Sequence, residues 1–343
     1  MRVAVVGATG AVGREMTRIL EERDFPVDGF VPLASERSAG RIVRFRGQEH
    51  TVGVQSVDAL AGVDFALSSC GGAVAKTWVP QAAENGTVCI DNSSAFRMEP
   101  WAALMIPEVN PESLDGGPRV ISVPNCTIIT TLMAVAPLHR EAGLRSLSVS
   151  SYQAVSGAGH RGVTELAEQV AKLHGTEDDL GHPDPTALPV GEVFGKTIAY
   201  NVVAKIDVFD EESGFTFEEI KMAREAKRIL SMPDLEIATT CVRVPVAVGH
   251  SVSVQATFER DLTPAEAREI LASAPGVQVR DDPANLVYPS PLEAAGGDDV
   301  LVGRIRQHPN HADTLLLFAC GDNLRKGAAL NAVQIAEAVL ARS

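Results

Sequence analysis

Residues 1–20 read MRVAVVGATGAVGREMTRIL, and this stretch predicts the architecture of the first part of the chain. The apolar run 3–6 predicts a short strand. A turn follows that contains three glycines: Gly7, Gly10 and Gly13. From Val12 onward, apolar residues recur at helical spacing: Val12, Met16, Ile19 and Leu20. A strand that passes through a glycine turn into a helix is typical of the pyrophosphate-binding start of a dinucleotide-binding domain.

The same alternation of strands and helices continues to about residue 125. Strand-like runs at 63–69 and 87–91 flank a helical stretch near 73–84. This order predicts an α/β, Rossmann-type N-terminal domain over residues 1–125, with a parallel, doubly wound sheet and right-handed crossovers. We expect the apolar helical segment 323–343 to pack back on this domain and complete it.

From residue 126 onward, long strand-like runs dominate. They predict an α+β domain over residues 126–322 with a large mixed, mostly antiparallel sheet. The runs are 145–155, 201–209, 236–248, 251–259, 299–307 and 313–321. Helices are predicted near 161–173, 217–230 and 264–272. The stretch 174–200 is rich in Gly, Pro and Asp and predicts a long irregular excursion.

Composition excludes several classes of function. The net charge of −14 argues against nucleic acid or an anionic membrane as a partner. No run approaches the about 20 apolar residues of a membrane span, and the N-terminus lacks a signal-peptide layout, so we expect a cytoplasmic protein. The five cysteines are widely spaced, and the histidines of HPNH (308–311) are too few for a metal site. We therefore expect no metal.

The end of the second predicted strand, near Leu33, bears on the choice of cofactor. An NAD enzyme places an acidic residue there for the ribose hydroxyls. Here the sequence continues with Arg37 and Ser38, which can hold a 2′-phosphate, while Glu36 can point to solvent. These residues favour NADP over NAD. An ordinary solvated turn is the alternative.

Cys126 is the candidate nucleophile. The run 119–125 reads as a strand that Pro124 ends, and the residues from Cys126 onward behave as a helix. At a helix N-terminus, the dipole and the open N–H groups favour a thiolate and can stabilise an oxyanion. The setting alone leaves a second interpretation open, in which the cysteine merely begins a helix.

A thiolate mechanism also needs a proton-transferring group. His250 follows a glycine at the joint of two predicted strands, where we expect an exposed position framed by rigid elements. His160, in SGAGHRG, is the other candidate.

Charged residues in apolar surroundings are candidate substrate ligands. Alternating valines from Val242 to Val248 predict one strand face, with Arg243 on the opposite face. Its guanidinium there requires a carboxylate, from a ligand or from an internal salt bridge. In the helix near 217–230, Thr216 and Glu219 fit a capping box.

Glu218 and Lys221 remain on one face of that helix, three residues apart. They form either a solvated ion pair or two charges presented to a zwitterionic, phosphorylated substrate. Periodicity does not distinguish these interpretations.

Taken together, these segments resemble the aspartate-semialdehyde dehydrogenase family of the bacterial type. The matching motifs occur in the family's order along nearly the whole chain: GATGAVG, ASERSAG, DNSSAFRM, PNCT, YQAVSGAG, FTFEEIKM, CVRVPVAVGHS and DNLRKGAALNAVQIAE. The resemblance implies that the second domain is a catalytic and dimerisation domain. It also implies a homodimer or a homotetramer.

The resemblance assigns roles to individual residues. Cys126 would form an acyl-thioenzyme, His250 would be the general acid/base, and Gln153 would orient substrate and thiol. The carboxylate of the substrate would bind Arg243, and its ammonium group Glu218. The phosphate site would consist of Arg97, Asn125 and Lys221. The residues that line NADP would be Gly7, Thr9, Gly10, Ala11, Val12, Gly13, Arg37, Ser38, Ser156, Gly157 and Asn323.

The implied reaction is the NADPH-dependent reductive dephosphorylation of 4-phospho-L-aspartate to L-aspartate 4-semialdehyde and phosphate. It belongs to the biosynthesis of lysine, through diaminopimelate, and of threonine, methionine and isoleucine. A related enzyme, N-acetyl-glutamyl-phosphate reductase, is the alternative within this chemistry, but its substrate has no free ammonium group. A Rossmann-fold sensor that binds NADP without catalysis is the alternative of another class.

Overall fold

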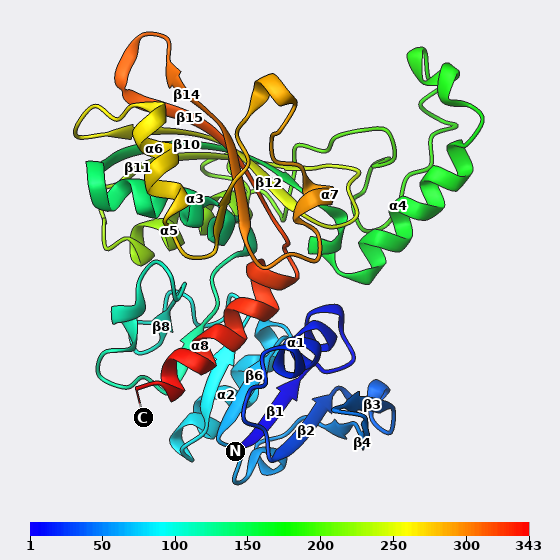
Figure 1. Ribbon diagram of the computed structural model, residues 1–343. Helices are drawn as coiled ribbons and strands as arrows, with labels where there is room; N and C mark the ends of the chain where they lie inside the picture. Colours follow the sequence, from blue (N-terminus) through cyan, green and yellow to red (C-terminus); the bar gives the residue numbers. More distant parts are fainter. Residues whose placement is uncertain (343) are drawn as a thin grey trace. The chain divides into compact units, whose positions relative to one another are not determined.

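The computed structural model describes residues 1–342, and the chain divides into two compact units (Figure 1). The first unit contains residues 1–136, residues 225–234 and the C-terminal segment that begins at Leu324. The second unit contains residues 137–224 and 235–323. No helix within residues 1–342 combines the length and the apolar character needed to cross a bilayer.

The first unit is built on a seven-stranded sheet in which every recorded pairing is parallel. The strand order is β5 (Gly53–Val54), β2 (Gly29–Ala34), β1 (Arg2–Val6), β6 (Phe65–Ser68), β7 (Val88–Asp91), β9 (Val120–Ser122) and β8 (Ala103–Leu104). A small antiparallel hairpin, β3 (Ile42–Phe45) and β4 (Gln48–Thr51), accompanies it. The predicted doubly wound sheet is confirmed, and the strand order reverses at β1, where such folds bind ligands.

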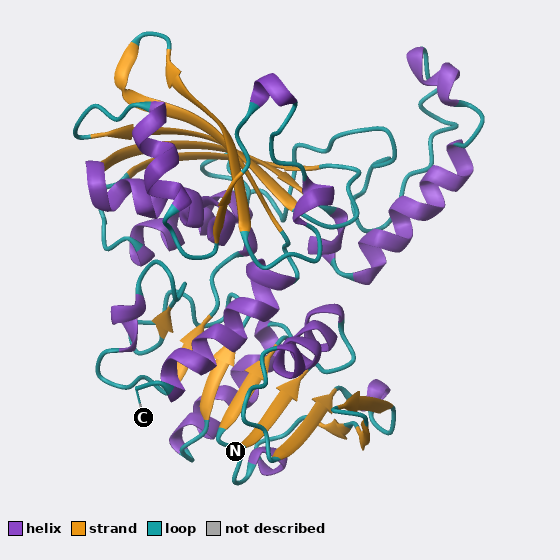
Figure 2. Ribbon diagram, in the orientation of Figure 1, coloured by secondary structure: helices purple, strands orange, loops and turns teal. Residues whose placement is uncertain are grey.

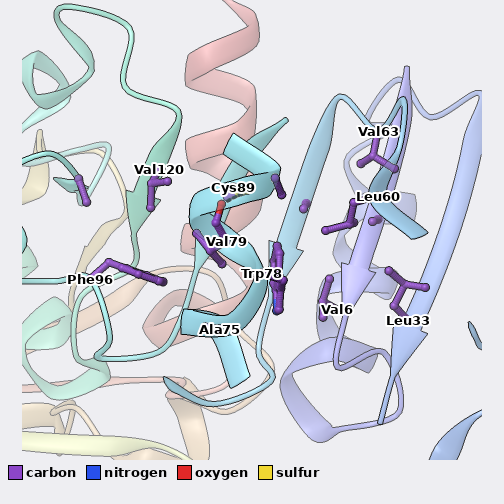
Figure 3. Close-up of a cluster of buried hydrophobic side chains, with 14 residues drawn as sticks. Val6, Leu33, Leu60, Val63, Ala75, Trp78, Val79, Cys89, Phe96 and Val120 are labelled. Atoms are coloured by element: carbon purple, nitrogen blue, oxygen red, sulfur yellow. Dashed lines mark hydrogen bonds between the residues drawn. The ribbon is translucent and has the colours of Figure 1, made fainter. Parts of the chain in front are cut away.

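One face of this sheet carries the core cluster drawn in Figure 3. Helix α2 (Gly72–Glu84) places Trp78 and Val79 against buried residues of the strands, among them Val6 and Leu33. All four of these side chains are buried. Full burial of an apolar side chain of this size contributes about 1.5–3 kcal/mol, so the cluster holds the carboxyl ends of the strands in place.

Helix α1 (Ala11–Glu22) and helix α8 (Leu330–Leu340) pack against each other, and α8 also packs against β6 and β7. The sequence predicts one continuous C-terminal helix, but a π-helical turn, Arg325–Ala329, precedes α8. Lys326 in this turn is 1% exposed, and its ammonium group lies 2.6 Å from Glu108 and 2.7 Å from Gln334. A buried ammonium group requires such partners. The π-helical turn places Lys326 where its side chain reaches Glu108 and Gln334.

The second unit is built on a six-stranded mixed sheet (Figure 2). The strand order is β11 (Glu236–Arg243), β10 (Leu144–Gln153), β12 (His250–Phe258), β15 (His311–Gly321), β14 (Val300–His308) and β13 (Val277–Val279). The two outermost pairings are parallel and the three central ones antiparallel. The predicted mixed, mostly antiparallel sheet is confirmed.

One end of this sheet collects functional candidates from four strands. The register pairs there are Gln153 with Arg243, Tyr152 with Ser251, and His250 with Gly321. Strands β10, β11 and β15 end at this place, and β12 begins there. We call this end of the sheet, with the residues that follow each strand, the site edge.

Three helices of the second unit fall where the sequence predicts them: α4 (His160–Leu173), α5 (Phe217–Ile229) and α6 (Pro264–Ala272). The short α7 (Pro291–Ala294) is not among the predicted helices. Helix α3 (Cys126–Ala142) begins in the first unit and ends in the second, and α5 begins in the second unit and ends in the first. Short 3-10 turns lie at Glu36–Ser38, Asp58–Leu60, Pro111–Leu114, Val155–Ala158, Glu177–Gly181 and Pro283–Asn285. The excursion 174–200 at the end of α4 is irregular apart from one of these turns, as predicted (Figure 1).

The strand predicted over residues 201–209 is wrong, because only isolated bridges occur there. Local side chains take the backbone hydrogen bonds that a strand would need. Asn201 accepts from the N–H of Val202 at 2.8 Å, and Asp207 accepts from the N–H of Val208 at 2.9 Å. Asp207 also has a φ of 69°, which no strand residue adopts.

The valine face predicted from Val242 to Val248 is also wrong beyond Arg243, where β11 ends. Pro245 has no N–H to give to a ladder. The N–H of Val246 instead donates to the carbonyl of Val244 at 2.8 Å, a tight turn that stops the strand.

Candidate active site

The glycine turn between β1 and α1 has the geometry of a phosphate cradle. Gly7 has a φ of 90°, and its N–H donates to the carbonyl of Leu33 at 2.8 Å. A Cβ on Gly13 would lie 2.1 Å from the carbonyl oxygen of Gly7. Only glycine at both positions lets the helix start this close to the strand.

Helix α1 begins at Ala11, with Gly10 as N-cap and no side-chain cap among residues 1–342. Its first N–H groups are therefore available to an anion. Gly10 is exposed, and Thr9, Ala11 and Val12 are half-buried beside it. The open helix start and the glycine cradle fit the pyrophosphate of a dinucleotide.

Two further candidates for cofactor binding follow β2, the neighbour of β1. Arg37 and Ser38 lie in the 3-10 turn Glu36–Ser38. Arg37 is exposed and Ser38 half-buried. An exposed guanidinium beside the switch point of the sheet fits an adenosine phosphate.

Cys126 is the first residue of α3 and is half-buried, so the predicted helix start is confirmed. The side-chain carbonyl of Asn125 accepts from the N–H of Thr127 at 2.8 Å and from that of Ile128 at 3.3 Å. Asn125 thus caps the helix and orients its first turn. The helix dipole at this end favours the thiolate form of a cysteine.

Glu225 forms hydrogen bonds with two candidates of the first unit, Arg97 and Asn125, and is not among the residues predicted from the sequence. Its carboxylate accepts from the backbone N–H of Asn125 at 2.6 Å and from Arg97 at 3.0 Å. Arg97 is buried and also donates to the carbonyls of Val123 and Asn92, both at 2.9 Å. Glu225 lies two turns after Glu218 in α5, and that helical spacing was the signal in the sequence.

His250, at the site edge of the second unit, is completely buried, so the exposed position expected for it is wrong. Its Nδ1 accepts from the N–H of Ala154 at 3.1 Å, which assigns the proton of the neutral ring to Nε2. Nε2 has no hydrogen-bond partner among the residues that the structure describes. A buried donor without a partner is uncommon and indicates a group kept for a ligand.

The surroundings of His250 depress its basicity. Burial, and then the positive charge of Arg243, hold the pKa of the imidazole well below its ordinary value. The backbone of Gly157 lies against both side chains, since a Cβ there would be 2.9 Å from Nη1 of Arg243 and 3.1 Å from Nε2 of His250. The ring is therefore neutral at neutral pH and keeps a proton on Nε2 for a hydrogen bond to a ligand.

Arg243 ends β11 beside His250. Its Nη1 donates to the carbonyl of Ala154 at 2.6 Å, and its guanidinium lies 5.8 Å from the centre of the Phe194 ring. The side chain is buried. A planar guanidinium held in this way presents a fork that matches a carboxylate.

Gln153 and Glu218 meet at the same edge. The side-chain amide of Gln153 donates to Glu218 and to the hydroxyl of Ser151, both at 3.3 Å. Gln153 and Glu218 are buried, which is costly for a carboxylate unless it serves a cation or a hydrogen-bond network.

Lys221 forms an ion pair with Asp207 at a distance of 2.5 Å. Burial works to raise the pKa of Asp207, but the hydrogen bonds from Lys221 and from the N–H of Val208 outweigh it and lower the pKa. The ammonium group of Lys221 thus binds Asp207, in the segment that follows Val203.

Ser156 and Asn323, two candidates for cofactor binding, are hydrogen-bonded to each other at 2.9 Å. The side-chain oxygen of Asn323 also accepts from the N–H of Gly249 at 2.9 Å, directly before His250. The other candidate base, His160, is exposed at the start of α4.

The structure therefore gathers the predicted residues into two sets. The first unit holds the glycine turn, Arg37, Ser38, Arg97, Asn125 and Cys126, and the site edge of the second holds Gln153, Ser156, Gly157, Glu218, Arg243, His250 and Asn323. Within residues 1–342, no three His, Cys, Asp or Glu side chains are grouped closely enough to hold a metal ion.

Comparison with known proteins agrees with this division. Residues 2–116 match a family described as semialdehyde dehydrogenase, NAD binding domain. Residues 135–326 match one described as semialdehyde dehydrogenase, dimerisation domain. The first unit thus carries an NAD(P)-binding domain.

Two relatives that match over nearly their full length are both named aspartate-semialdehyde dehydrogenase. The aspartate-semialdehyde dehydrogenase of Aquifex aeolicus is 45% identical over 98% of this chain and 97% of the relative. That of Bacillus subtilis is also 45% identical, over 99% of this chain and 97% of the relative. The crystal structure of aspartate semialdehyde dehydrogenase II complexed with ASA, from Vibrio cholerae, superposes with a TM-score of 0.90 at 40% identity and covers 99% of this chain and 98% of the other.

Proposed function

The chain belongs to the aspartate-semialdehyde dehydrogenase family, and we propose that it interconverts 4-phospho-L-aspartate and L-aspartate 4-semialdehyde with NADP as cofactor. The observation that carries this proposal is the site edge, where a buried, neutral His250 with an unpartnered Nε2, within residues 1–342, lies beside Arg243. An acid/base next to a carboxylate-binding guanidinium suits a small anionic substrate.

Cys126 would supply the covalent step. In the biosynthetic direction its thiolate attacks the acyl carbon of 4-phospho-L-aspartate, the C–S bond forms, and the C–O bond to phosphate breaks. The result is a thioester on Cys126 and inorganic phosphate. The helix start and the Asn125 cap support the thiolate.

Bound NADPH would supply the hydride that reduces the thioester carbon. The hemithioacetal on Cys126 then collapses, the C–S bond breaks, and the aldehyde leaves. The neutral His250 would stabilise the oxyanion of this intermediate with a hydrogen bond from its Nε2–H, and collapse returns Cys126 as the thiolate.

The remaining residues would hold the substrate. Arg243 would bind the α-carboxylate, Glu218 the α-ammonium group, and Gln153, hydrogen-bonded to Glu218, would orient the reacting carbonyl. Arg97, which uses three of its five N–H donors on partners among residues 1–342, would bind phosphate together with Asn125 and Lys221.

NADP would be held by the glycine turn, by Arg37 and Ser38 at its phosphate, and by Ser156, Gly157 and Asn323. The close approach of Gly13 to Gly7 and the open start of α1 support this assignment. We retain residues 1–125 with 323–343, and residues 126–322, as the proposed functional domains. The reaction would serve lysine, threonine, methionine and isoleucine biosynthesis in the cytoplasm.

A homodimer or a homotetramer is part of this proposal. The second unit exposes large apolar side chains that favour a protein partner: Tyr200, Val202, Val208, Phe209, Phe215, Phe217, Leu286 and Leu292. Sedimentation or light scattering of the purified chain would measure the assembly, and a monomer would contradict it.

The decisive assay follows NADP reduction with L-aspartate 4-semialdehyde and inorganic phosphate as substrates. We expect turnover that requires all three, and a much lower rate with NAD in place of NADP. Preference for N-acetyl-glutamate semialdehyde would favour the related reductase instead, and binding of NADP without turnover would favour a sensor.

A further inference from the structure

Helix α5 begins with a capping box whose glutamate also binds a neighbouring strand. The Glu219 carboxylate accepts from the N–H of Thr216 at 2.7 Å, and the hydroxyl of Thr216 accepts from the N–H of Glu219 at 3.4 Å. These two bonds are the capping box that the sequence predicts. The second carboxylate oxygen of Glu219 accepts from the backbone N–H of Cys241 in β11 at 2.8 Å.

The contact with Cys241 closes the open edge of a strand. β11 is an outer strand of the six-stranded sheet, and among the strands of residues 1–342 its one neighbour is β10, apart from an isolated bridge of Arg243 to Val203. In such a strand, alternate N–H groups point away from the neighbour and need another partner. Glu219 satisfies the N–H of Cys241, and the carbonyl of Val203 satisfies that of Arg243 at 2.8 Å.

Two further bonds complete a frame around this edge. The hydroxyl of Thr239 donates to the backbone carbonyl of Glu219 at 3.2 Å. The ion pair of Lys221 with Asp207 ties α5 to the segment that follows Val203. The frame thus joins the start of α5, the end of β11 and this segment, all within the second unit.

The position of Glu219 in this frame has a consequence for substrate binding. Glu218, the residue before it, is the proposed ligand of the ammonium group. Arg243, two residues after Cys241 in β11, is the proposed ligand of the carboxylate. Glu219 is 9% exposed, and its side chain bonds the helix that carries one ligand directly to the strand that carries the other.

We propose that Glu219 is a positioning residue that sets the separation of the two substrate ligands, Glu218 and Arg243. This inference rests on the proposed function of these two residues. Glu219 itself has its carboxylate oxygens committed to backbone N–H groups, so it acts through the helix and the strand and not by touching the substrate. A fixed separation of an anion and a cation selects substrates whose ammonium and carboxylate groups match it.

The chain offers a matched control in the same unit. Thr263 and Glu266 form a second capping box, at the start of α6, with bonds of 2.9 and 3.2 Å. The Glu266 side chain is 46% exposed, and its other contacts are to the side chains of Thr263 and Arg260. Replacing Glu266 by Ala therefore removes a cap of the same chemistry without touching β11.

The kinetic test measures KM for L-aspartate 4-semialdehyde and for NADP in Glu219→Ala, Glu219→Gln and Glu266→Ala. We expect Glu219→Ala to raise the KM for the semialdehyde about tenfold and to leave the KM for NADP within about twofold. The variant loses the buried, charge-assisted bond from Cys241 to Glu219, which holds the two substrate ligands and not the proposed cofactor ligands. Glu219→Gln keeps one acceptor oxygen and should give a smaller rise. An equal effect in Glu266→Ala, or equal rises in both KM values, would overturn the proposal.

Hydrogen exchange of the same proteins tests the frame without any substrate. We expect faster amide exchange over Thr239–Arg243 in Glu219→Ala, and wild-type exchange there in Glu266→Ala. Unchanged exchange in Glu219→Ala would refute the frame even if the enzyme turned over the semialdehyde. If the wild-type protein shows no phosphate-dependent turnover, the proposed function is refuted. The exchange data would still test whether Glu219 holds α5 and β11 together.

Discussion

The glycine turn of the first unit and the site edge of the second are built in opposite ways. The turn is one continuous stretch, Gly7–Gly13, that runs from the end of β1 into the first turn of α1. The site edge draws Gln153, Arg243 and His250 from the ends of three different strands. The first kind of site depends on local conformation and can be recognised as a motif. The second kind depends on strand order, and any change in register disperses it.

The largest effect should come from the nucleophile, which belongs to the local kind. Cys126→Ala removes the only group to which we assign covalent chemistry, and we expect turnover to fall by on the order of 10⁴-fold or more. Cys70→Ala is the control, since Cys70 is half-buried in the same unit and has no assigned role. Turnover above about one hundredth of the wild-type rate in Cys126→Ala would contradict the mechanism.

The next effect tests the assembled kind of site. Arg243→Lys keeps the charge but loses the planar fork held by the carbonyl of Ala154. We expect KM for L-aspartate 4-semialdehyde to rise about tenfold to a hundredfold, while the KM for NADP changes little. Steady-state kinetics with each substrate varied in turn would measure this. A KM for the semialdehyde that stays at the wild-type value would remove Arg243 from the substrate site.

A smaller effect probes how tightly the local site is packed. Gly13→Ala places a methyl group against the carbonyl of Gly7, and we expect a loss of about 1–3 kcal/mol in the free energy of unfolding and weaker NADP binding. Gly72→Ala, at the start of α2, meets its nearest atom only at 3.6 Å and should lose little. Equal stability of the two variants in denaturant melts would show that the cradle can relax.

The smallest effect concerns pH and His250. Burial lowers its pKa in the folded protein, so below the ordinary histidine value of about 6.5 the unfolded chain binds a proton that the folded chain does not. Stability should therefore fall as the pH drops from about 6.5 towards the depressed folded pKa. His250→Asn should show a flatter dependence over this window. His160→Asn, at an exposed position, should keep the wild-type slope.

Parts of the site could be predicted from short stretches of sequence, and each has a local cause. The turn at Gly7, the helix start at Cys126 and the capping box of Thr216 and Glu219 all appear where the sequence predicts them. In each case the conformation follows from residues within a few positions, through glycine freedom, helix ends or side-chain capping.

The failures share a different cause. The sequence pattern predicts an exposed His250 because it follows a glycine between two strands, but neighbouring strands and the turn after Gln153 bury it. No local pattern marks Glu225, because its partners Arg97 and Asn125 are 128 and 100 residues away in the sequence. Burial and long-range pairing depend on which strands are neighbours, and no local pattern encodes that.

Local sequence patterns are thus sufficient to predict the parallel first domain, the glycine cradle and a cysteine at a helix N-terminus. The common edge of Gln153, Arg243 and His250 appears only in the folded chain, because it follows from the strand order β11, β10, β12, β15. The tertiary structure also distinguishes two capping boxes of the same sequence pattern. Glu219 binds a strand N–H that has no partner in the sheet, whereas Glu266 lies at the surface. The same local chemistry acquires a different role when the surrounding fold supplies a second partner.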